Sequence, residues 1–570
     1  VARDPFASRA VATSVLHTPS DAQHRAIERL AASSAGDVLL LHGVTGSGKT
    51  LVYIELLRRV VLEEGKTAIV LVPEIALTPQ TVDRFRAVFG DKVAVLHSAL
   101  SEGERYDEWL ALERGQKRIV VGARSAIFAP VRDLGAIIVD EEHESSYKQG
   151  ESPRYHAREV AIVRARNDGA IVVLGSATPS VETWVNAQSG KYTLLSLPAR
   201  VGEARLPHIE VVDRREARRR QRDAGAGQRD AADWLRLVVS RPLELALADR
   251  LEKREQSILL LNRRGYAAFV QCAACGDVAT CPNCSISLTY HRTPERLVCH
   301  YCQHAEPPRT VCPRCGGLVM RERGLGTQQV ERLLADRFPA ARIARMDVDT
   351  TSGKWAHAEI LDRVAAGEVD VLLGTQMIAK GLDFPNVTLV GVVDADVGIN
   401  LPDFRASERC FQLLSQVAGR AGRGPKGGQV LIQTRVPEHH AVRCAVAHDY
   451  TGFMRQELAG RAMPTYPPNV RLANVVVSGT TEAATASAAI AAAAWLHRLL
   501  RSKPMPGLTV IGPAPCPVER IKNRWRWHLL VKSEQTADLT RVGRYFLEHF
   551  AMPKDAGLRV AFDRDPVALL

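Results

Sequence analysis

Residues 43–50, Gly-Val-Thr-Gly-Ser-Gly-Lys-Thr, have the composition and spacing of a phosphate-binding loop. In such a loop the backbone N–H groups wrap a polyphosphate, the lysine reaches its terminal phosphates and the last hydroxyl holds Mg2+. The alternative is a glycine-rich turn that binds nothing. The sequence favours a nucleotide site, with ATP and Mg2+ held by Gly43, Gly46, Ser47, Gly48, Lys49 and Thr50.

An acidic cluster, Asp140-Glu141-Glu142-His143, directly follows the apolar run 137–139. Phosphoryl transfer needs a carboxylate that completes the Mg2+ shell and a group that orients or deprotonates the attacking water. We assign the first task to Asp140 and the second to Glu141. Acidic clusters are usually solvated turns, but the upstream phosphate loop favours the catalytic interpretation.

The elements that position these residues alternate between apolar runs typical of strands and helical stretches. This alternation predicts a parallel sheet covered by helices, with ligands at the carboxyl ends of its strands. A hydroxyl-bearing segment, 175–179, also follows a strand. A helix at 21–31 carries Gln23, whose amide offers a donor and an acceptor to adenine; taken alone, such a glutamine is a surface residue. The expected strands after the phosphate loop lie at 68–72, 93–96, 118–121, 136–139 and 171–174.

The segments named above, together with Gln-Val-Ala-Gly-Arg-Ala-Gly-Arg at 416–423, resemble motifs I, II, III and VI of superfamily 2 helicases. The resemblance implies two RecA-like lobes that close on ATP. It also implies that Gln416 lies at the nucleotide, and that Arg420 and Arg423 stabilise charge on the transferring phosphate. From the residues alone, a solvated turn rich in glycine and arginine is the alternative.

The stretch 140–158 resembles the aromatic-rich loop of the bacterial primosomal replication-restart helicases. The resemblance suggests that its tyrosines stack on unpaired bases while its basic side chains meet phosphates. Packing of the tyrosines within the loop is the plain alternative. The residues concerned are Tyr147, Lys148, Arg154, Tyr155 and Arg158.

Three further segments resemble strand-contacting motifs of the same family. Residues 72–80 and 122–128 belong to the first lobe, and the second of these carries Arg124. Residues 371–385 resemble the fifth motif, which contacts the tracking strand and the nucleotide together, and they contain Lys380.

Four C-x-x-C pairs occur between residues 272 and 315. Eight thiolates in this pattern fit two tetrahedral four-cysteine zinc sites, although thiolates alone also suit an iron–sulfur centre. The fourteen residues between Cys284 and Cys299 suit a two-knuckle ribbon, whereas the five between Cys275 and Cys281 are few. The spacing therefore favours nested sites, in which the second pair joins the third and the first pair joins the fourth. The family resemblance implies the same pairing. The expected sites are Cys281, Cys284, Cys299 and Cys302, and Cys272, Cys275, Cys312 and Cys315.

Residues 461–570 read as a small α+β domain in the order β-α-β-β-α-β. Alternation along the strand at 524–531 would place Arg524, Arg526 and His528 on one face and two tryptophans on the other. We expect the two arginines to face a phosphate backbone.

Composition narrows the class of protein. The 570 residues carry a net charge of +12, from 75 Lys and Arg against 63 Asp and Glu, which favours an anionic partner such as nucleic acid. No uninterrupted apolar run reaches the length that spans a bilayer, and no signal peptide precedes the first lobe. We therefore expect a cytoplasmic protein without a membrane partner.

The predicted fold class is α/β, with two RecA-like parallel-sheet lobes, a double four-cysteine zinc insertion in the second lobe and a small α+β C-terminal domain. The expected divisions are a linker at 1–17, lobe 1 at 18–200, a basic connector with the start of lobe 2 at 201–256, the first strand of lobe 2 at 257–270, the zinc insertion at 271–318, lobe 2 at 319–460 and the C-terminal domain at 461–570.

The family resemblance covers nearly all of the chain from residue 18. It implies an ATP-driven helicase that moves 3′ to 5′ on single-stranded DNA at stalled forks and restarts replication. The implied partners are single-stranded and forked DNA, primosome proteins, a replicative helicase loader and single-stranded DNA-binding protein. Two alternatives stay open: a fork-binding scaffold without helicase activity, and an RNA helicase or duplex translocase.

Two features suggest a piece of a longer chain. The first residue is Val1 rather than methionine. The family carries a 3′-end-binding domain and a winged helix before the first lobe, and this sequence holds neither. Recognition of a nascent 3′ end by this chain is therefore not expected from the sequence.

Overall fold

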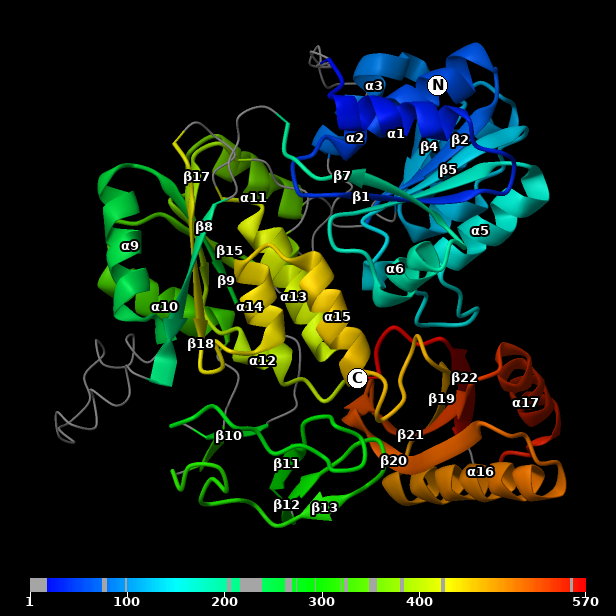
Figure 1. Cartoon of the computed structure of the whole chain (residues 1–570), viewed down its shortest axis with the longest axis vertical. Helices are drawn as coiled ribbons and strands as arrows, with labels where there is room; N and C mark the ends of the chain where they lie inside the picture. Colours follow the sequence, from blue (N-terminus) through cyan, green and yellow to red (C-terminus); the bar gives the residue numbers. More distant parts are fainter. Residues whose placement is uncertain are drawn as a thin grey trace.

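The computed structural model contains two parallel sheets, a cysteine-rich module and an antiparallel sheet (Figure 1). The structure describes residues 18–73, 79–97, 100–201, 207–215, 238–261, 269–272, 274–292, 294–317, 319–321, 326–347, 356–379, 384–421, 426–553 and 557–569. The proposed linker 1–17, most of the basic connector, Lys380 and Arg423 lie outside these ranges.

Lobe 1 is built on a seven-stranded sheet in the order β3-β4-β2-β5-β6-β1-β7, and all of its strand pairs are parallel. Its central strands are almost entirely buried because helices cover both faces, as their continuous apolar runs predict. The strands are β1 (Val38–Gly43), β2 (Thr67–Leu71), β3 (Val93–Leu96), β4 (Ile119–Gly122), β5 (Leu134–Asp140), β6 (Ile171–Ser176) and β7 (Thr193–Leu197). The five strands expected after the phosphate loop are all present.

The helices of lobe 1 begin where the sequence carries capping residues. Ser20 and Gln23 form a reciprocal capping box at the start of α1, and Ser101 and Glu104 form another at α4. Ser180 caps α6 through the N–H of Thr183. The helices are α1 (Asp21–Ala31), α2 (Lys49–Leu57), α3 (Pro79–Phe89), α4 (Glu102–Glu113), α5 (Ala157–Asp168) and α6 (Val181–Gln188).

Lobe 2 has a six-stranded parallel sheet in the order β15-β16-β9-β17-β18-β8. Its strands are β8 (His208–Asp213), β9 (Gln256–Leu260), β15 (Ile343–Met346), β16 (Val371–Gly374), β17 (Val387–Val392) and β18 (Gln429–Thr434). Its helices are α9 (Arg241–Glu252), α10 (Thr327–Arg337), α11 (Ala356–Ala365), α12 (Asp396–Ile399), α13 (Ala406–Ala418), α14 (His440–Val446) and α15 (Tyr450–Gly460).

The sheet of lobe 2 starts earlier in the chain than the sequence indicated. β8 lies within 201–256, the segment expected to hold a basic connector and the start of lobe 2, ahead of the expected first strand at 257–270, and it pairs with β18 from His208↔Gln429 to Asp213↔Thr434. β8 is an edge strand with one neighbour and alternating polar residues, so it lacks the apolar run that marked the other strands.

The cysteine-rich module is inserted between β9 and α10 and lies below lobe 2 in Figure 1. Its first and last strands, β10 (Val270–Cys272) and β14 (Val319–Arg321), pair antiparallel, so the two ends of the insertion lie side by side. This pairing explains how the insertion leaves the sheet of lobe 2 intact. The other strands of the module are β11 (Thr289–Arg292), β12 (Glu295–Val298) and β13 (Ala305–Glu306).

The C-terminal domain has the predicted order of elements. Its antiparallel sheet runs β20-β21-β19-β22, and its two helices lie on the outer side in Figure 1. By length and composition α16 is apolar enough to cross a membrane, but its alanines pack against the sheet. The elements are β19 (Arg471–Gly479), α16 (Glu482–Ser502), β20 (Leu508–Ile521), β21 (Arg524–Ser533), α17 (Thr536–His549) and β22 (Arg559–Arg564).

Candidate active site and zinc centres

The phosphate loop joins β1 to α2 at the carboxyl edge of the lobe 1 sheet. Gly46 and Gly48 have φ values of +85° and +77°, a region that glycine enters without strain. The ammonium of Lys49 donates a hydrogen bond of 3.0 Å to the carbonyl of Gly43. Among the described residues, the buried Oγ of Ser47 has no hydrogen-bond partner, so it is available to a ligand. The loop therefore has the conformation and the donors that a polyphosphate needs.

Gln23 braces the phosphate loop from α1. Its side-chain nitrogen donates to the Ser47 carbonyl at 2.9 Å, and its oxygen accepts from the Ser20 N–H at 2.8 Å. The residue is only 1% exposed. The sequence placed this amide on adenine, whereas the structure shows its donor and acceptor engaged within lobe 1.

Asp140 ends β5 beside the phosphate loop. Its Oδ1 accepts a hydrogen bond of 2.9 Å from the hydroxyl of Tyr53 on α2. A Cβ on Gly175 would lie 1.6 Å from that hydroxyl, so only glycine leaves room for the contact. Burial and the neighbouring charge of Glu141 raise the pKa of Asp140 to about 6. A nearby cation would favour the ionised form.

Glu141 follows Asp140 with a left-handed backbone, φ +46°, which is strained for a residue with a side chain. Its Oε2 is buried and makes no hydrogen bond within the described part of the chain. This Oε2 lies 3.7 Å from Nδ1 of His143. A strained backbone that presents an uncommitted carboxylate oxygen beside Asp140 suits a group that orients water.

His143 connects three motifs across the two lobes. Its Nε2 accepts a hydrogen bond of 2.9 Å from the amide of Gln416 on α13. Its Nδ1 lies 2.8 Å from the Oγ of Ser176, which also accepts from the Thr178 N–H at 3.0 Å. Because the Gln416 amide is a donor here, Nδ1 carries the proton of the neutral ring and donates to Ser176. Gln416 thus contacts the acidic segment rather than the phosphate loop.

The end of α13 abuts the phosphate loop. A Cβ on Gly419 would lie 2.5 Å from Cγ2 of Thr45, so the backbone of lobe 2 lies directly against the Thr45 side chain at this point. Arg420 follows Gly419 directly, so its backbone lies beside this contact between the lobes. The structure therefore brings the phosphate loop and the end of α13 together where the two lobes meet.

Glu142 and Arg158 form a buried ion pair. Glu142 is fully buried and accepts from Arg158 Nη1 at 2.7 Å, from the Ser180 N–H at 2.7 Å and from the Thr183 hydroxyl at 2.9 Å. Arg158 also donates to the Ser180 hydroxyl at 2.8 Å. The sequence assigned Arg158 to phosphates; in this structure its guanidinium joins motif II to the start of α6.

The lobes are also joined by buried charges that the sequence analysis did not identify. Arg405 donates to Glu182 at 2.6 Å, and Glu408 accepts from the Val181 N–H at 3.0 Å. Arg461 donates to Glu408 at 2.7 Å. Arg405 and its neighbours hold the pKa of Glu182 below its ordinary value despite burial. Charged residues on helices are usually exposed, so composition gave no signal for this network.

Two residues of the aromatic-rich loop that the sequence assigned to DNA contact protein groups in this structure. Tyr147 is 1% exposed and its hydroxyl donates to the Asp140 carbonyl at 2.6 Å, so packing within the loop accounts for it. Lys148 pairs with Asp563 of the C-terminal domain at 2.9 Å. Arg124 supports the loop by donating to the carbonyls of Ser146 and Lys148.

Tyr155 and Arg154 remain accessible at the edge of the same loop. The ring of Tyr155 meets the exposed ring of Phe128 edge-on, with centroids 5.0 Å apart, and Arg154 is exposed. Tyr155 also packs in part against the lobe 1 core.

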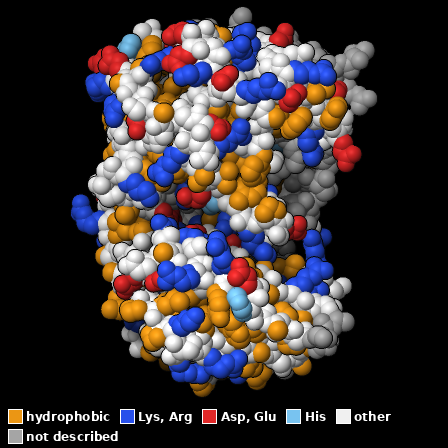
Figure 2. Space-filling view, turned by 90° about the vertical axis from the view of Figure 1, so that its right-hand side faces the viewer, with side chains coloured by type: hydrophobic (Ala, Val, Ile, Leu, Met, Phe, Trp, Pro, Cys, Tyr) orange, Lys and Arg blue, Asp and Glu red, His pale blue; other side chains and the backbone are white. Residues whose placement is uncertain are grey.

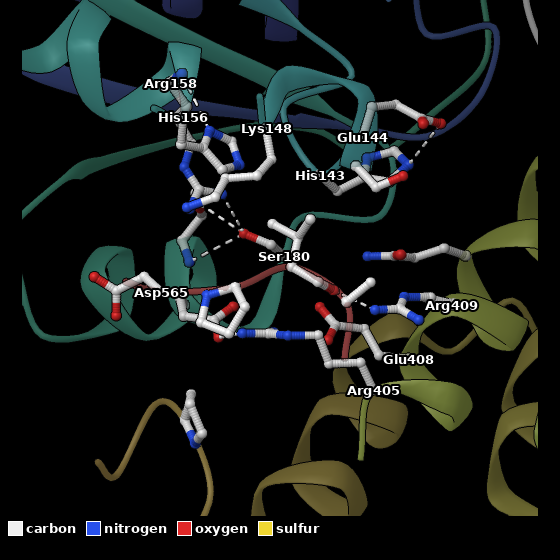
Figure 3. A pocket seen from close by; sticks show the side chains of 18 of the residues that line it. His143, Glu144, Lys148, His156, Arg158, Ser180, Arg405, Glu408, Arg409 and Asp565 are labelled. Atoms are coloured by element: carbon white, nitrogen blue, oxygen red, sulfur yellow. Dashed lines mark hydrogen bonds and ion pairs between the residues drawn. The ribbon is translucent and has the colours of Figure 1, made fainter. Parts of the chain in front are cut away.

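A cavity of about 680 Å³ lies where the two lobes and the C-terminal domain meet. Figure 3 shows Lys148, Arg158, Arg405 and Arg409 around it, with His143 at one side. Figure 2 shows a hollow at mid-height of the molecule in which basic and acidic side chains gather. The cavity reaches His143 and therefore borders the chain of contacts that runs to the phosphate loop.

The eight cysteines form the two nested clusters that the sequence predicted. In each cluster the four sulfurs lie within 4.8 Å of one another. Sulfur–sulfur distances of 3.6 Å for Cys272–Cys315 and Cys281–Cys302 exclude disulfides and match the separation of about 3.8 Å expected around tetrahedral zinc. Backbone N–H groups of Ala274 and Tyr301 point at two of the sulfurs. These are two four-cysteine zinc-binding sites.

The second zinc cluster shares a hydrophobic core with the C-terminal domain. Cys281, Cys284 and Cys299 pack with Tyr466, whose hydroxyl donates to the Cys284 carbonyl at 2.8 Å. His528 of β21 donates to the carbonyl of His300 at 2.7 Å. The zinc module is therefore anchored on the C-terminal domain as well as on lobe 2.

β21 shows the predicted alternation. His528 is buried on the side of the zinc module, and Trp527 packs on the opposite side against α16. Arg524 donates to the carbonyls of Ser478 and Gly557, and Arg526 donates to that of Val518. Both guanidiniums are half-buried and contact their own domain.

Four family models match the chain. They are the DEAD/DEAH box helicase over residues 20–186, the helicase conserved C-terminal domain over 322–425, the PriA DNA helicase Cys-rich region domain over 281–307 and the primosomal protein N C-terminal domain over 462–567. Two RecA-like lobes carrying these motifs define a superfamily 2 helicase fold.

The relatives narrow this class further. The chain is 47% identical over its whole length to the replication restart protein PriA of Bacillus subtilis, of which it spans 69%. It is 46% identical over 87% of its length to the same protein of Synechocystis, of which it spans 58%. Among solved structures, Saccharomyces cerevisiae Dbp5 bound to RNA and ADP BeF3 is 14% identical, with a TM-score of 0.46 over 76% of this chain and 88% of that one. The chain belongs to the PriA family of replication restart proteins.

Proposed function

We propose that this chain is the motor of a replication restart helicase, which hydrolyses ATP to move 3′ to 5′ along single-stranded DNA at stalled or collapsed forks. The observation that supports this most directly is the contact of Gly419 with Thr45, because it sets lobe 2 against the phosphate loop of lobe 1. Catalysis by this class of enzyme requires groups from both sides of the nucleotide.

We propose the following roles for the site residues. Lys49 and the loop N–H groups bind the β and γ phosphates, while Thr50 and Asp140 hold Mg2+, which when bound neutralises charge on the phosphates. Glu141 orients the attacking water through its uncommitted oxygen. Arg420 and Arg423 stabilise charge that develops on the transferring phosphoryl group.

DNA would bind along the face that contains the cavity. Arg154 is exposed for contact with a phosphate, Tyr155 is partly exposed for contact with a base, and Arg124 and Lys380 belong to segments that resemble strand-contacting motifs. Four other basic residues assigned to DNA already contact protein groups in this structure: Lys148, Arg158, Arg524 and Arg526. To bind DNA, each would have to break that contact and replace it with one to a phosphate. The net charge of +12 supports a polyanionic ligand.

The wider role rests on family membership. We propose that the protein acts in the cytoplasm with primosome proteins, a replicative helicase loader and single-stranded DNA-binding protein. The second candidate function is a fork-binding scaffold with little helicase activity, which the joined domains would also support. The intact Lys49, Asp140 and Glu141 favour the motor.

Steady-state ATP hydrolysis tests the motor. It is measured without nucleic acid and with single-stranded DNA, a forked duplex, duplex DNA or RNA, at matched salt because phosphate contacts depend strongly on salt. We expect the forked and single-stranded DNA to stimulate hydrolysis, and Lys49→Ala to abolish it. DNA binding without hydrolysis would support the scaffold instead, and stimulation by RNA alone would contradict a DNA motor.

A further inference from the structure

Arg200 lies outside every helicase motif, yet its segment runs along the phosphate loop. The Val44 N–H donates to the Leu197 carbonyl at 3.2 Å, and the Val201 N–H donates to the Gly46 carbonyl at 3.0 Å. The stretch after β7 is therefore tied to the phosphate loop on both sides of Arg200.

The side chain of Arg200 spans the gap between the lobes. A Cβ on Gly46 would lie 3.6 Å from Cγ and 3.8 Å from Nε of Arg200, so the stem lies across this glycine at van der Waals distance. At its far end, Nη2 donates to the carbonyl of Gly419 at 3.3 Å. One side chain thus contacts the phosphate loop and the end of α13 together.

Gly419 is the residue through which lobe 2 approaches the loop. Its Cα faces Thr45 so closely that a Cβ would lie 2.5 to 2.8 Å from three side-chain atoms of Thr45. Arg420 follows it, so the position of the Gly419 carbonyl determines where the Arg420 side chain begins.

We propose that Arg200 is a positioning residue for ATP hydrolysis: it holds Gly419 against the phosphate loop and thereby directs Arg420 toward the γ phosphate. This inference rests on the proposed ATPase function. The hydrogen bond is charge-assisted, and the planar guanidinium keeps a defined direction that an ammonium does not. Because hydrolysis depends on groups placed within about 1 Å, loss of this tether should affect turnover more than nucleotide binding.

The test compares Arg200→Ala, Arg200→Lys, Gly419→Ala and the double variant Arg200→Ala/Gly419→Ala. The measurements are kcat and KM for ATP with saturating single-stranded DNA, and the Kd of a fluorescent ADP analogue. The control is Arg114→Ala, which removes an exposed arginine of lobe 1 far along the chain from the loop. We expect Arg200→Ala to lower kcat roughly tenfold to a hundredfold, with the Kd for ADP within about twofold of the wild type.

The double variant separates positioning from direct contact. If Arg200 acts through Gly419, the double variant should be no slower than the slower single variant, and Arg200→Lys should recover part of the lost kcat. If the kcat losses of the two single variants multiply in the double variant, and ADP binds more weakly, then Arg200 contacts the nucleotide itself. That result would overturn the proposal. Wild-type kcat in Arg200→Ala would overturn it as well.

The same measurements distinguish this inference from the function on which it rests. An absence of DNA-stimulated hydrolysis in the wild-type chain would overturn the proposed function and this inference with it. Hydrolysis that is normal in the wild type, absent in Lys49→Ala and unaffected in Arg200→Ala would overturn the inference alone.

Discussion

Lys148 of lobe 1 and Asp563 of the C-terminal domain form an ion pair of 2.9 Å, with side chains only 8% and 18% exposed. Lys148 also donates to the Arg564 carbonyl at 2.7 Å. The loop that follows the acidic motif is therefore joined to strand β22, more than four hundred residues further along the chain.

This ion pair predicts that the C-terminal domain stabilises the aromatic-rich loop. Asp563→Ala leaves a largely buried ammonium without its partner, which typically costs about 3 kcal/mol. We expect a lower melting temperature and faster proteolysis near residue 150. The paired change Lys148→Asp/Asp563→Lys should restore part of the loss. If the double variant loses as much stability as the two single variants combined, the two residues do not form a specific pair.

Asp140 predicts a trade of stability against activity. Its pKa is about 6 in the folded chain against 3.8 ordinarily, so the folded state holds this proton more tightly than the unfolded state. The Asp140 carboxyl therefore does not lower the free energy of unfolding below about pH 4. It lowers that free energy increasingly as the pH rises to about 6, and by a constant amount above that pH. A difference of about 2 pKa units corresponds to about 3 kcal/mol.

Asp140→Asn should therefore unfold less readily than the wild type at pH 7, while its hydrolysis of ATP is lost. The asparagine oxygen still accepts from Tyr53. Denaturant titration at pH 4 and pH 7 checks this, since the two proteins should differ at pH 7 and converge at pH 4. A gain of equal size at both pH values would rule out the ionisation as its cause.

Gly175 and Tyr53 form a second pair whose coupling is measurable. A Cβ at residue 175 would lie 1.6 Å from the tyrosine hydroxyl, so Gly175→Ala must displace that hydroxyl from Asp140. We expect a large loss of stability and of kcat from Gly175→Ala. The loss should be smaller in the Tyr53→Phe background, because the clashing oxygen is gone. If Gly175→Ala lowers stability and kcat equally in both backgrounds, the loss does not come from a clash with the Tyr53 hydroxyl.

The sequence predicted the motifs better than the contacts between them. Phosphate-loop spacing, strand ends and cysteine pairs depend on short stretches of chain, so Lys49, Asp140 and the nested zinc clusters could be found. The engagement of Gln23 with Ser47 and of Lys148 with Asp563 depends on how distant segments pack, which periodicity does not report.

The same limit explains the elements that were missed. β8 is an edge strand whose alternating residues resemble a polar connector until β18 lies beside it. Tyr147 and Tyr155 have the same residue type in one loop, yet the first is buried beneath Asp140 and the second is accessible. Composition cannot separate two such tyrosines.

The shared core of the second zinc cluster and the C-terminal domain predicts unequal effects of losing each metal. Cys299→Ser removes a ligand of the cluster that packs against Tyr466, whereas Cys315→Ser removes an exposed ligand of the other cluster. Each variant should bind one zinc ion per chain rather than two, as measured by metal analysis of freshly purified protein. Only Cys299→Ser should also increase proteolysis within the C-terminal domain, because Tyr466 loses its packing partner. Equal proteolysis in the two variants would show that the zinc module and the C-terminal domain fold independently, and far fewer than two zinc ions in the wild type would contradict both sites.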